Sequence, residues 1–341
     1  MRQFWSGLAL EIGIDMTYAV GENLTGVGRY SLQLLAGLWE LGENIQWIQY
    51  FRPKQWLRTN EPKRLLWDAF PPRVSLFHGL NQRLPRRGKA PMVATFHDLF
   101  VLSGEYSTPE FRQRFAHQAR TAAERADIII AVSRFTADQV EEFLGFPGDR
   151  IRVVPHGVAP LADALLHLPR RPVVLTVGAV QKRKNTARLI QAFAALPEPW
   201  ELWVVGSLGY GAEEIRQLAE RQARVKLLGY VPDAELPKLY AEASVFAFPS
   251  LDEGFGIPVL EAMAYGLPVL TANRSALPEV AGDAALLVDP DSVEAIAEGL
   301  LRLTEETTQA HYRSAGFHRQ REFTWERAAR MTFEVYRQLL P

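Results

Sequence analysis

The chain has 341 residues, of which 48% are hydrophobic and 23% charged, and its formal net charge is −1. This length suits two domains of ordinary size, and the composition is that of a globular protein rather than a disordered one. The near-neutral charge argues against a nucleic-acid partner, and the absence of cysteine excludes disulfides and thiolate metal sites.

The N-terminal stretch does not favour export or insertion into a membrane. Glu11 interrupts its apolar residues and no small-residue cleavage site follows, so we expect no signal peptide. No run of about 18 apolar residues occurs in the chain, which argues against a membrane-spanning helix. We therefore expect a cytoplasmic protein, at most attached to the inner face of the cytoplasmic membrane.

Short apolar, β-branched runs alternate with longer amphipathic stretches along the whole chain. The predicted strands are 13–16, 46–50, 74–77, 92–96, 128–132, 151–154, 173–177, 201–205, 225–228, 245–248, 269–271 and 285–288. The predicted helices are 28–41, 109–126, 133–143, 185–195, 212–224, 233–243, 258–265 and 292–304. This alternation predicts an α/β fold with parallel sheets covered by helices, and two sets of about six strands predict two Rossmann-like domains.

The boundary between the two predicted domains falls in a proline-rich stretch, 160–172, with weak periodicity. We place an N-terminal domain at 1–165 and a C-terminal domain at 166–324. A final helix, 325–341, follows Thr324, which resembles a helix cap, and carries apolar residues at helical spacing.

The segment 51–90 is strongly basic. It holds ten lysine or arginine residues against Glu61 and Asp68, which leaves +8, and Trp56, Trp67 and Phe70 lie among them. Such a segment suits an anionic membrane surface or a lipid-phosphate acceptor. The alternative is an ordinary solvated surface whose aromatic side chains pack inward.

A glycine-containing turn follows the first predicted strand and opens a helix. It consists of Gly26, Val27, Gly28, Arg29 and Tyr30. The spacing lacks the third glycine of a dinucleotide-binding fingerprint. We expect a loop that lets the backbone approach a ligand, and the alternative is a plain helix-start turn.

Polar residues follow two neighbouring apolar runs. His97 and Asp98 end the run 91–96, and His78 ends the run before it. Ligands bind at the carboxyl ends of strands in open α/β sheets, and a His-Asp pair there can position hydroxyls or move protons. The alternative is a hydrogen-bonded histidine with no function beyond packing.

A basic stretch, Gly178–Asn185, directly follows a strand in the second half and contains Arg183 and Lys184. Cations at this place could hold a diphosphate. A merely structural helix start is disfavoured, because cations oppose the helix dipole there.

The string 249–264 is the most informative of the chain. Glu253 and Glu261 lie eight residues apart; Gly254, Phe255, Gly256 and Ile257 follow the first, and Pro258 predicts a helix start. Free backbone N–H groups at the start of a helix suit a phosphate, and the carboxylates can accept hydrogen bonds from sugar hydroxyls. The string therefore predicts a nucleotide-sugar site.

This string resembles the E-x7-E signature of the GT4-type retaining glycosyltransferases, which have the GT-B fold of two Rossmann-like domains facing across a cleft. The resemblance implies that Glu253 contacts the transferred sugar and Glu261 the donor ribose. It implies cleft roles for 26–30, His97 and Asp98, and diphosphate binding by Arg183 and Lys184. It also places the turn of Gly229, Tyr230 and Val231 against the nucleotide base.

The resemblance implies a hexosyltransferase that moves a sugar to a hydroxyl of a glycan or lipid-linked glycan. The site strings look most like those of members that use GDP-mannose, so mannose is the expected sugar. The only Asp-x-Asp string, Asp289–Asp291, lies late in the chain, in a sequence that favours a turn. We therefore expect no metal and no cofactor besides the nucleotide sugar. Two alternatives stay open: a non-hydrolysing nucleotide-sugar epimerase, and a non-catalytic nucleotide-sugar-binding or membrane scaffold protein.

Overall fold

The computed structural model describes residues 10–21, 24–42, 45–59, 62–159 and 168–340. The described residues form an N-terminal unit (10–102, 110–157 and 325–340) and a C-terminal unit (103–109, 158–159 and 168–324). Residues 1–9, on which part of the signal-peptide expectation depends, and 160–167 of the predicted boundary lie outside the described residues.

The N-terminal unit is built on a seven-stranded parallel sheet in the order β3-β2-β1-β4-β5-β6-β7. Its strands are β1 (Leu10–Asp15), β2 (Ile45–Phe51), β3 (Arg64–Leu65), β4 (Leu76–Gly79), β5 (Met92–Phe96), β6 (Ile128–Ala131) and β7 (Ile151–Val153). The order reverses between β1 and β4, as it does in doubly wound nucleotide-binding folds. Every carboxyl end lies at one edge of the sheet and every amino end at the other.

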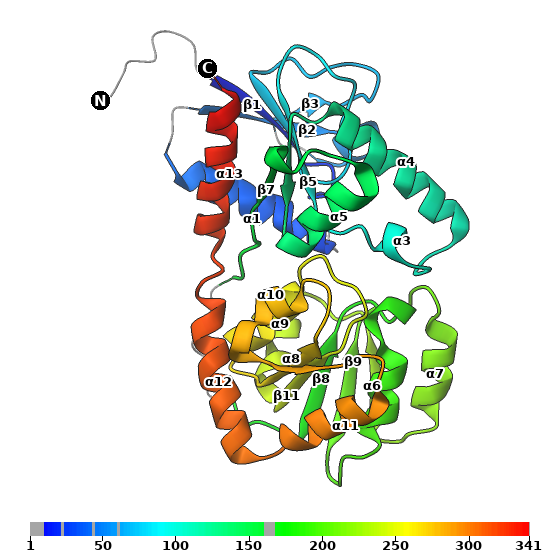
Figure 1. Ribbon diagram of the computed structural model, residues 1–341. Coiled ribbons are helices and arrows are strands. Elements are labelled where there is room, and N and C mark those ends of the chain that lie inside the picture. Colours follow the sequence, from blue (N-terminus) through cyan, green and yellow to red (C-terminus); the bar gives the residue numbers. More distant parts are fainter. Residues whose placement is uncertain (1–9, 22–23, 43–44, 60–61, 160–167, 341) are drawn as a thin grey trace. The chain divides into compact units, whose positions relative to one another are not determined.

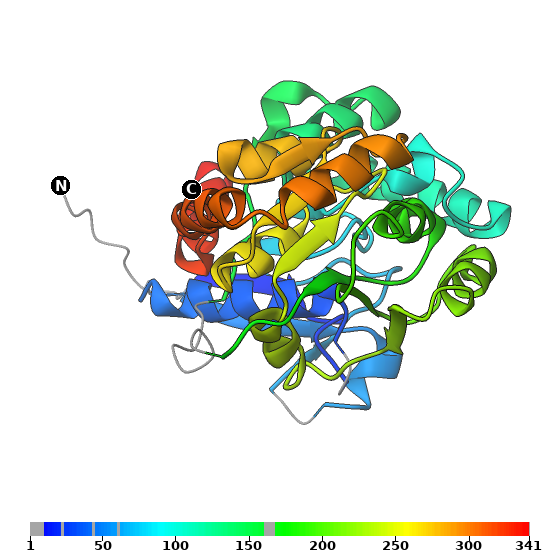
Figure 2. The same cartoon turned by 90° about the horizontal axis from the view of Figure 1, so that it is seen from below.

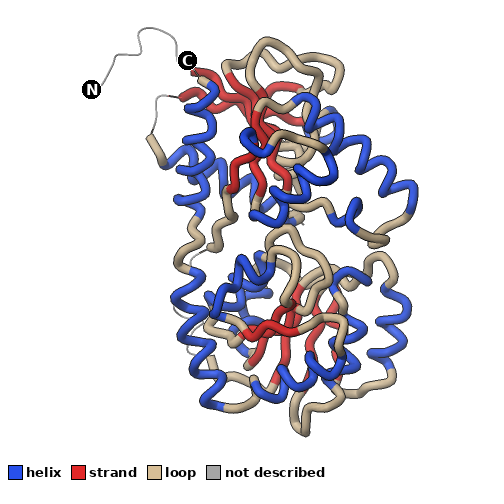
Figure 3. The backbone as a smooth tube through the Cα atoms, viewed as in Figure 1, coloured by secondary structure: helices blue, strands red, loops and turns tan. Residues whose placement is uncertain are grey.

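Helices cover both faces of this sheet (Figures 1 and 3). They are α1 (Gly26–Glu40), α2 (Pro53–Trp56), α3 (Phe100–Ser103), α4 (Pro109–Arg125), α5 (Arg134–Leu144) and α13 (Trp325–Leu339). Helices α1 and α13 share one hydrophobic cluster with β1 and β4, although they lie at opposite ends of the sequence. Gly37 permits this contact, because a Cβ there would come within 2.9 Å of the Ala329 Cβ.

The C-terminal unit has a six-stranded parallel sheet in the order β10-β9-β8-β11-β12-β13. The strands are β8 (Val173–Val177), β9 (Glu201–Val205), β10 (Val225–Gly229), β11 (Val245–Phe248), β12 (Val269–Ala272) and β13 (Leu286–Val288). The reversal between β8 and β11 defines the point at which the loops after these two strands diverge to opposite faces of the sheet.

Helices also lie on both sides of this second sheet, which Figure 2 shows from a direction at right angles to Figure 1. They are α6 (Thr186–Phe193), α7 (Ala212–Glu220), α8 (Leu236–Glu242), α9 (Ile257–Ala264), α10 (Leu277–Ala281), α11 (Val293–Arg302) and α12 (Glu306–Gln320). Residues of α6, α7 and α11 form one continuous core with the strands. The predicted pair of parallel-sheet α/β units is confirmed.

The predicted elements differ from the observed ones in their bounds and in the elements that were missed, which are the short β3, α2, α3 and α10 and the longer α12. Boundaries move by a few residues, because pairing partners set strand ends: β1 starts at Leu10, which pairs with Ile45. Helix α12 was not predicted, because it is mostly polar and only its Gly316 is fully buried, close to Met263 of α9. Among the described residues, no helix is both long enough and apolar enough to span a membrane.

Candidate functional site

The loops that follow β8 and β11 are held together at the reversal point of the C-terminal sheet. The Leu251 N–H donates to the Arg183 carbonyl at 2.8 Å. Asn185, in the left-handed conformation with φ 59°, donates its side-chain amide to the carbonyls of Pro249 (3.0 Å) and Pro290 (2.6 Å). Asn185 thereby ties three loops at the carboxyl edge, where α/β sheets bind ligands.

Glu253 accepts hydrogen bonds from two of the three cations of the basic stretch, Arg183 and Lys184. Its Oε1 lies 2.6 Å from the Lys184 Nζ, and its Oε2 lies 2.9 Å from the Arg183 Nη1. All three side chains are largely buried. Burial works to raise the pKa of Glu253, but the charges of Arg183 and Lys184 outweigh it and bring the pKa below its usual range. Two cations around one carboxylate leave one net positive charge in this trio.

Asp252, which the sequence reasoning missed, is buried beside this trio. One carboxylate oxygen interacts with the Ser103 hydroxyl at 2.5 Å, while the backbone carbonyl of Asp252 accepts a hydrogen bond from Arg183. Burial raises the pKa of this carboxyl more than Ser103 and Arg183 lower it. Asp252 therefore differs from Glu253 in the direction of its pKa shift, although the two are adjacent.

The turn after Glu253 leads directly into α9. Phe255 is buried, with its ring centroid 5.8 Å from that of Phe323 in an edge-to-face contact. Gly256 has φ +104°, a conformation that favours glycine, and α9 begins at Ile257 with Pro258 in its first turn. The predicted helix start at Pro258 is confirmed to within one residue.

Glu261 lies in the second turn of α9, where its Oε2 accepts a hydrogen bond from the Tyr240 hydroxyl at 2.9 Å. The Tyr240 ring stacks on Tyr265 with centroids 5.2 Å apart. Tyr240 comes from α8, and nothing in its local sequence marks it as a partner of Glu261. The predicted base-contacting residues Gly229, Tyr230 and Val231 lie at the carboxyl end of β10, and Tyr230 is exposed.

In the N-terminal unit, His97 follows β5 and stacks on His156, which follows β7. Their ring centroids are 5.2 Å apart with planes at 12°. The His97 Nε2 lies 2.8 Å from the Leu80 carbonyl, which can only accept, so the neutral ring leaves Nδ1 to face the His156 Nε2 at 3.4 Å. Burial lowers the pKa of His97 to about 4 and that of His156 also below its usual range.

His78 and Tyr30, both predicted cleft residues, lie in the interior of the unit. The His78 Nδ1 is 2.6 Å from the Tyr336 hydroxyl, and its Nε2 is 2.8 Å from the Thr95 hydroxyl, which Tyr30 contacts at 3.1 Å. Burial lowers the pKa of His78 to about 3 and raises that of Tyr30. These two residues support the strand ends under His97 and have almost no exposed surface.

The predicted glycine loop is the first turn of α1. Thr25 caps the helix by accepting a hydrogen bond from the Gly28 N–H at 3.3 Å, and Gly26 and Val27 form the first helical positions. Arg29 is half-buried in the same turn, and Asp98 is half-buried after β5. This carboxyl edge therefore presents the start of α1, His97 and Asp98.

A buried Asp15–Arg52 pair at the same edge was not predicted as part of a site. The Arg52 Nη2 lies 3.7 Å from an Asp15 carboxylate oxygen, and Arg52 also contacts Asp68. Asp15 ends β1 and His156 lies three residues after the end of β7, so the rule that singled out His97 could have found them. Within the described ranges, no group of three or more His, Cys, Asp or Glu side chains is placed to hold a metal ion.

The sequence matches two known families. Residues 162–318 match the family described as "Glycosyl transferases group 1", and residues 44–160 match "Glycosyltransferase Family 4". The Escherichia coli "O-antigen chain mannosyltransferase B" is 30% identical over 375 aligned positions, which cover 93% of this chain and 97% of the relative.

Solved structures agree in fold. A sucrose-phosphate synthase from Thermosynechococcus elongatus superposes with a TM-score of 0.76 at 24% identity, covering 97% of this chain and 99% of the other. Anabaena HepE, solved with UDP and glucose, gives a TM-score of 0.74 at 18% identity, covering 97% and 100%. With a relative of this identity and coverage and a family match in each half, the chain belongs to the group 1, family 4 glycosyltransferases of the GT-B fold.

Proposed function

We propose that the protein is a retaining hexosyltransferase that moves mannose from GDP-mannose to a hydroxyl of a glycan or lipid-linked glycan. The observation that carries this proposal is the buried trio of Arg183, Lys184 and Glu253 at the reversal point of the C-terminal sheet. A nucleotide sugar offers both an anion and hydroxyls, and the trio offers an excess positive charge together with a carboxylate.

Each group has a proposed role in the transfer. Arg183 and Lys184 stabilise the negative charge that develops on the diphosphate as the glycosidic bond breaks, and the backbone N–H groups at the start of α9 assist them. Glu253 orients the sugar hydroxyls, and Glu261, held by Tyr240, binds the ribose. With Glu261 committed to the ribose, the two glutamates do not form a glycosidase pair, which needs an acid and a second carboxylate flanking the bond.

The acceptor is proposed to bind the N-terminal unit at the first turn of α1, His97 and Asp98. His97 is half-buried, and its pKa of about 4 leaves the ring uncharged at neutral pH. A neutral imidazole whose Nε2 already donates to Leu80 is suited to holding a sugar hydroxyl and not to storing a proton. Asp98 is the residue we propose to assist the acceptor hydroxyl.

The mannose assignment is supported by the name of the Escherichia coli relative and by the resemblance of the site strings to GDP-mannose enzymes. UDP is the competing nucleotide, because HepE was solved with UDP and glucose. Base recognition by the turn Gly229–Val231 would depend mostly on backbone groups, so side chains do not separate these candidates.

Thermal unfolding with GDP, UDP and ADP, each with and without EDTA, tests the donor. A ligand that binds only the folded protein raises its Tm by mass action. We expect a rise in Tm with GDP alone, unchanged by EDTA. A larger rise with UDP or ADP would indicate a different donor nucleotide. No rise with any of the three would contradict the nucleotide-sugar assignment. Product analysis without acceptor then separates transfer from epimerisation, since only an epimerase would release a new nucleotide sugar.

A further inference from the structure

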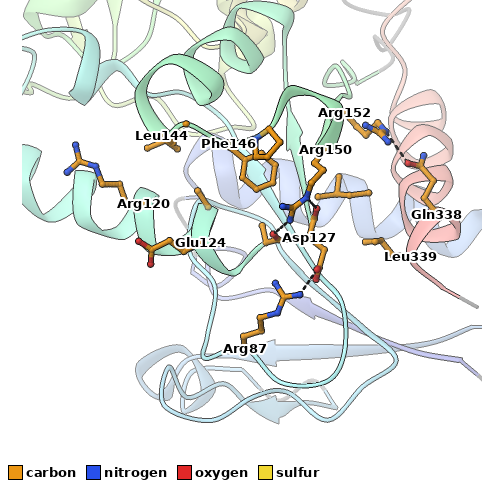
Figure 4. A pocket seen from close by; sticks show the side chains of 15 residues that line it. Arg87, Arg120, Glu124, Asp127, Leu144, Phe146, Arg150, Arg152, Gln338 and Leu339 are labelled. Atoms are coloured by element: carbon orange, nitrogen blue, oxygen red, sulfur yellow. Dashed lines mark hydrogen bonds and ion pairs between the residues drawn. The ribbon is translucent and has the colours of Figure 1, made fainter.

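Two polar features of the molecule have no role in the proposed transfer. One is a cavity of about 880 Å³ at the amino edge of the N-terminal sheet, with Arg120 and Glu124 of α4 and Gln338 of α13 around it (Figure 4). Ligands of α/β sheets bind at the carboxyl edge, so this cavity is not part of the transfer site. The other is the buried carboxyl group of Asp252, which lies at the carboxyl edge of the C-terminal sheet, next to Glu253.

The backbone of Asp252 helps to hold Arg183 in place. The Arg183 Nη1 donates to the Asp252 carbonyl and, at 2.9 Å, to the Glu253 Oε2. The Leu251 N–H donates to the Arg183 carbonyl, so the backbone of Arg183 is attached to the same loop. A guanidinium is a rigid planar fork, and fixing Nη1 therefore fixes the directions of its other N–H groups. The position of the Asp252 carbonyl thus contributes to where Arg183 points.

The Asp252 side chain is held in turn by a residue far away in the sequence. Asp252 is 6% exposed, and its Oδ2 accepts a hydrogen bond from the Ser103 hydroxyl at 2.5 Å. Its other oxygen, Oδ1, is buried and has no hydrogen-bond partner among the described residues. The orientation of this carboxyl group therefore depends on Ser103.

Ser103 begins the segment 103–109, which belongs to the C-terminal unit although the residues on both sides of it belong to the N-terminal unit. Gly104 permits a close turn in this segment, because a Cβ there would come within 2.4 Å of the Tyr106 ring. Burial and, after it, the charge of Asp252 raise the pKa of Tyr106, so Tyr106 also lies in the neighbourhood of Asp252. The segment thus packs beside the carboxyl group that Ser103 orients.

We propose that Ser103 and Asp252 are positioning residues that hold Arg183 in the orientation that binds the diphosphate of the donor. The Ser103 hydroxyl fixes the Asp252 side chain, the Asp252 carbonyl fixes Arg183, and Arg183 meets the anion. This inference rests on the proposed diphosphate-binding role of Arg183. An ionised Asp252 by itself repels an anion, so removal of its side chain should weaken anion binding if Asp252 positions Arg183 and strengthen it if Asp252 acts only as a charge.

Calorimetric titration of the full chain with inorganic pyrophosphate tests the positioning without the base or the sugar. Ser103→Ala deletes the hydroxyl without a change of charge and should weaken pyrophosphate binding about tenfold, whereas Ser103→Thr keeps the hydroxyl and should bind within about threefold of wild type. Asp252→Ala should also weaken binding about tenfold. Asp252→Asn keeps an oxygen that accepts from Ser103 and should bind at least as well as Ser103→Thr.

A matched control and thermal unfolding separate positioning from a loss of stability. Ser314 is exposed on α12, and Ser314→Ala should be folded and bind pyrophosphate as wild type does. If Ser103→Ala does not fold, the comparison of Asp252→Ala with Asp252→Asn gives the same test.

Three results would overturn the proposal: wild-type affinity in a folded Ser103→Ala protein, tighter binding in Asp252→Ala, or no binding of pyrophosphate to wild type. The proposed function can fail separately. Pyrophosphate binding that Ser103→Ala weakens and Ser103→Thr restores, in a protein that no nucleotide stabilises, would support the positioning and contradict only the nucleotide-sugar assignment.

Discussion

The Lys184 ammonium lies 2.6 Å from the Glu253 carboxylate, and neither side chain has much contact with solvent. Because Arg183 occupies the second oxygen of the same carboxylate, three charges share one buried site. Removing Glu253 leaves two buried cations without a carboxylate, which links the chemistry of the site to the stability of the C-terminal unit.

The first prediction concerns this linkage. Glu253→Ala leaves two buried cations without their carboxylate and should cost about 3–5 kcal/mol of unfolding free energy, so it is a poor test of catalysis alone. Glu253→Gln keeps the shape and an acceptor, and should lower kcat roughly a hundredfold in a protein that still folds. Urea unfolding of Glu253→Gln, Lys184→Met and the double variant should give a coupling energy of about 1–3 kcal/mol; strict additivity would contradict the shared site.

The second prediction is a loss of unfolding free energy in acid that begins at a pH well above the range in which ordinary carboxyl groups titrate. Burial brings the pKa of His78 to about 3 and that of His97 to about 4, while an unfolded histidine titrates near 6.5. As the pH falls below about 6.5, the unfolded chain binds protons that the folded chain does not, so each such histidine costs about 1.4 kcal/mol per pH unit until its folded pKa is reached.

Burial raises the pKa of Asp15 and Asp252, so these carboxyl groups stabilise the folded state as the pH falls and oppose the effect of the histidines. Single variants are therefore needed to isolate the contribution of one histidine. Urea unfolding between pH 7 and pH 5 should show a shallower pH slope for His97→Gln than for wild type, by about one proton. The exposed His117 provides the control: the pH slope of His117→Gln should equal that of wild type. Equal slopes in all three proteins would contradict a neutral His97 with a lowered pKa.

The third prediction distinguishes two glycines of one turn. An Ala at position 28 would place its Cβ 2.4 Å from the Tyr18 carbonyl oxygen, whereas an Ala at position 26 would meet nothing within 4 Å. Gly28→Ala should therefore cost about 1–3 kcal/mol in thermal unfolding, and Gly26→Ala less than about 0.5 kcal/mol. A folded Gly26→Ala protein with impaired acceptor binding would support close ligand approach at this turn, and equal stability losses would contradict the geometry.

The fourth prediction concerns the orientation of Glu261. Tyr240→Phe deletes the hydrogen bond to Glu261 but keeps the ring stack on Tyr265. A hydrogen bond of about 0.5–1.5 kcal/mol corresponds to a rise in KM for the donor of about two- to thirteenfold, with kcat within about twofold. Tyr265→Phe keeps the same stack and the Glu261 bond, and its KM should match that of wild type. A fall in kcat at constant KM would contradict a ribose-holding role.

Sequence patterns located most strands because buried parallel strands are short apolar runs bounded by breakers. The bounds of β5, β8, β9 and β11 agree with those predicted. Helix α12 could not be predicted in this way, since it packs through Gly316 and carries no apolar stripe. Periodicity detects a helix only when its buried face is apolar and wide.

The same division holds for the candidate site. The residue types after β8 and β11 predicted diphosphate binding by Arg183 and Lys184 and sugar contact by Glu253, and the strand order brings these three residues together. Their mutual ion pairing depends on β8 lying beside β11, which no local pattern encodes. Tyr240 and His156 were missed because their partners, Glu261 and His97, lie 21 and 59 residues away along the chain.

The strands of the N-terminal sheet also set a length scale. Strand β1 has six residues, so the carboxyl edge stands about 20 Å from the amino edge. A hydroxyl bound near His97 would therefore lie about two nanometres from the amino edge, with the packed interior of the sheet between them.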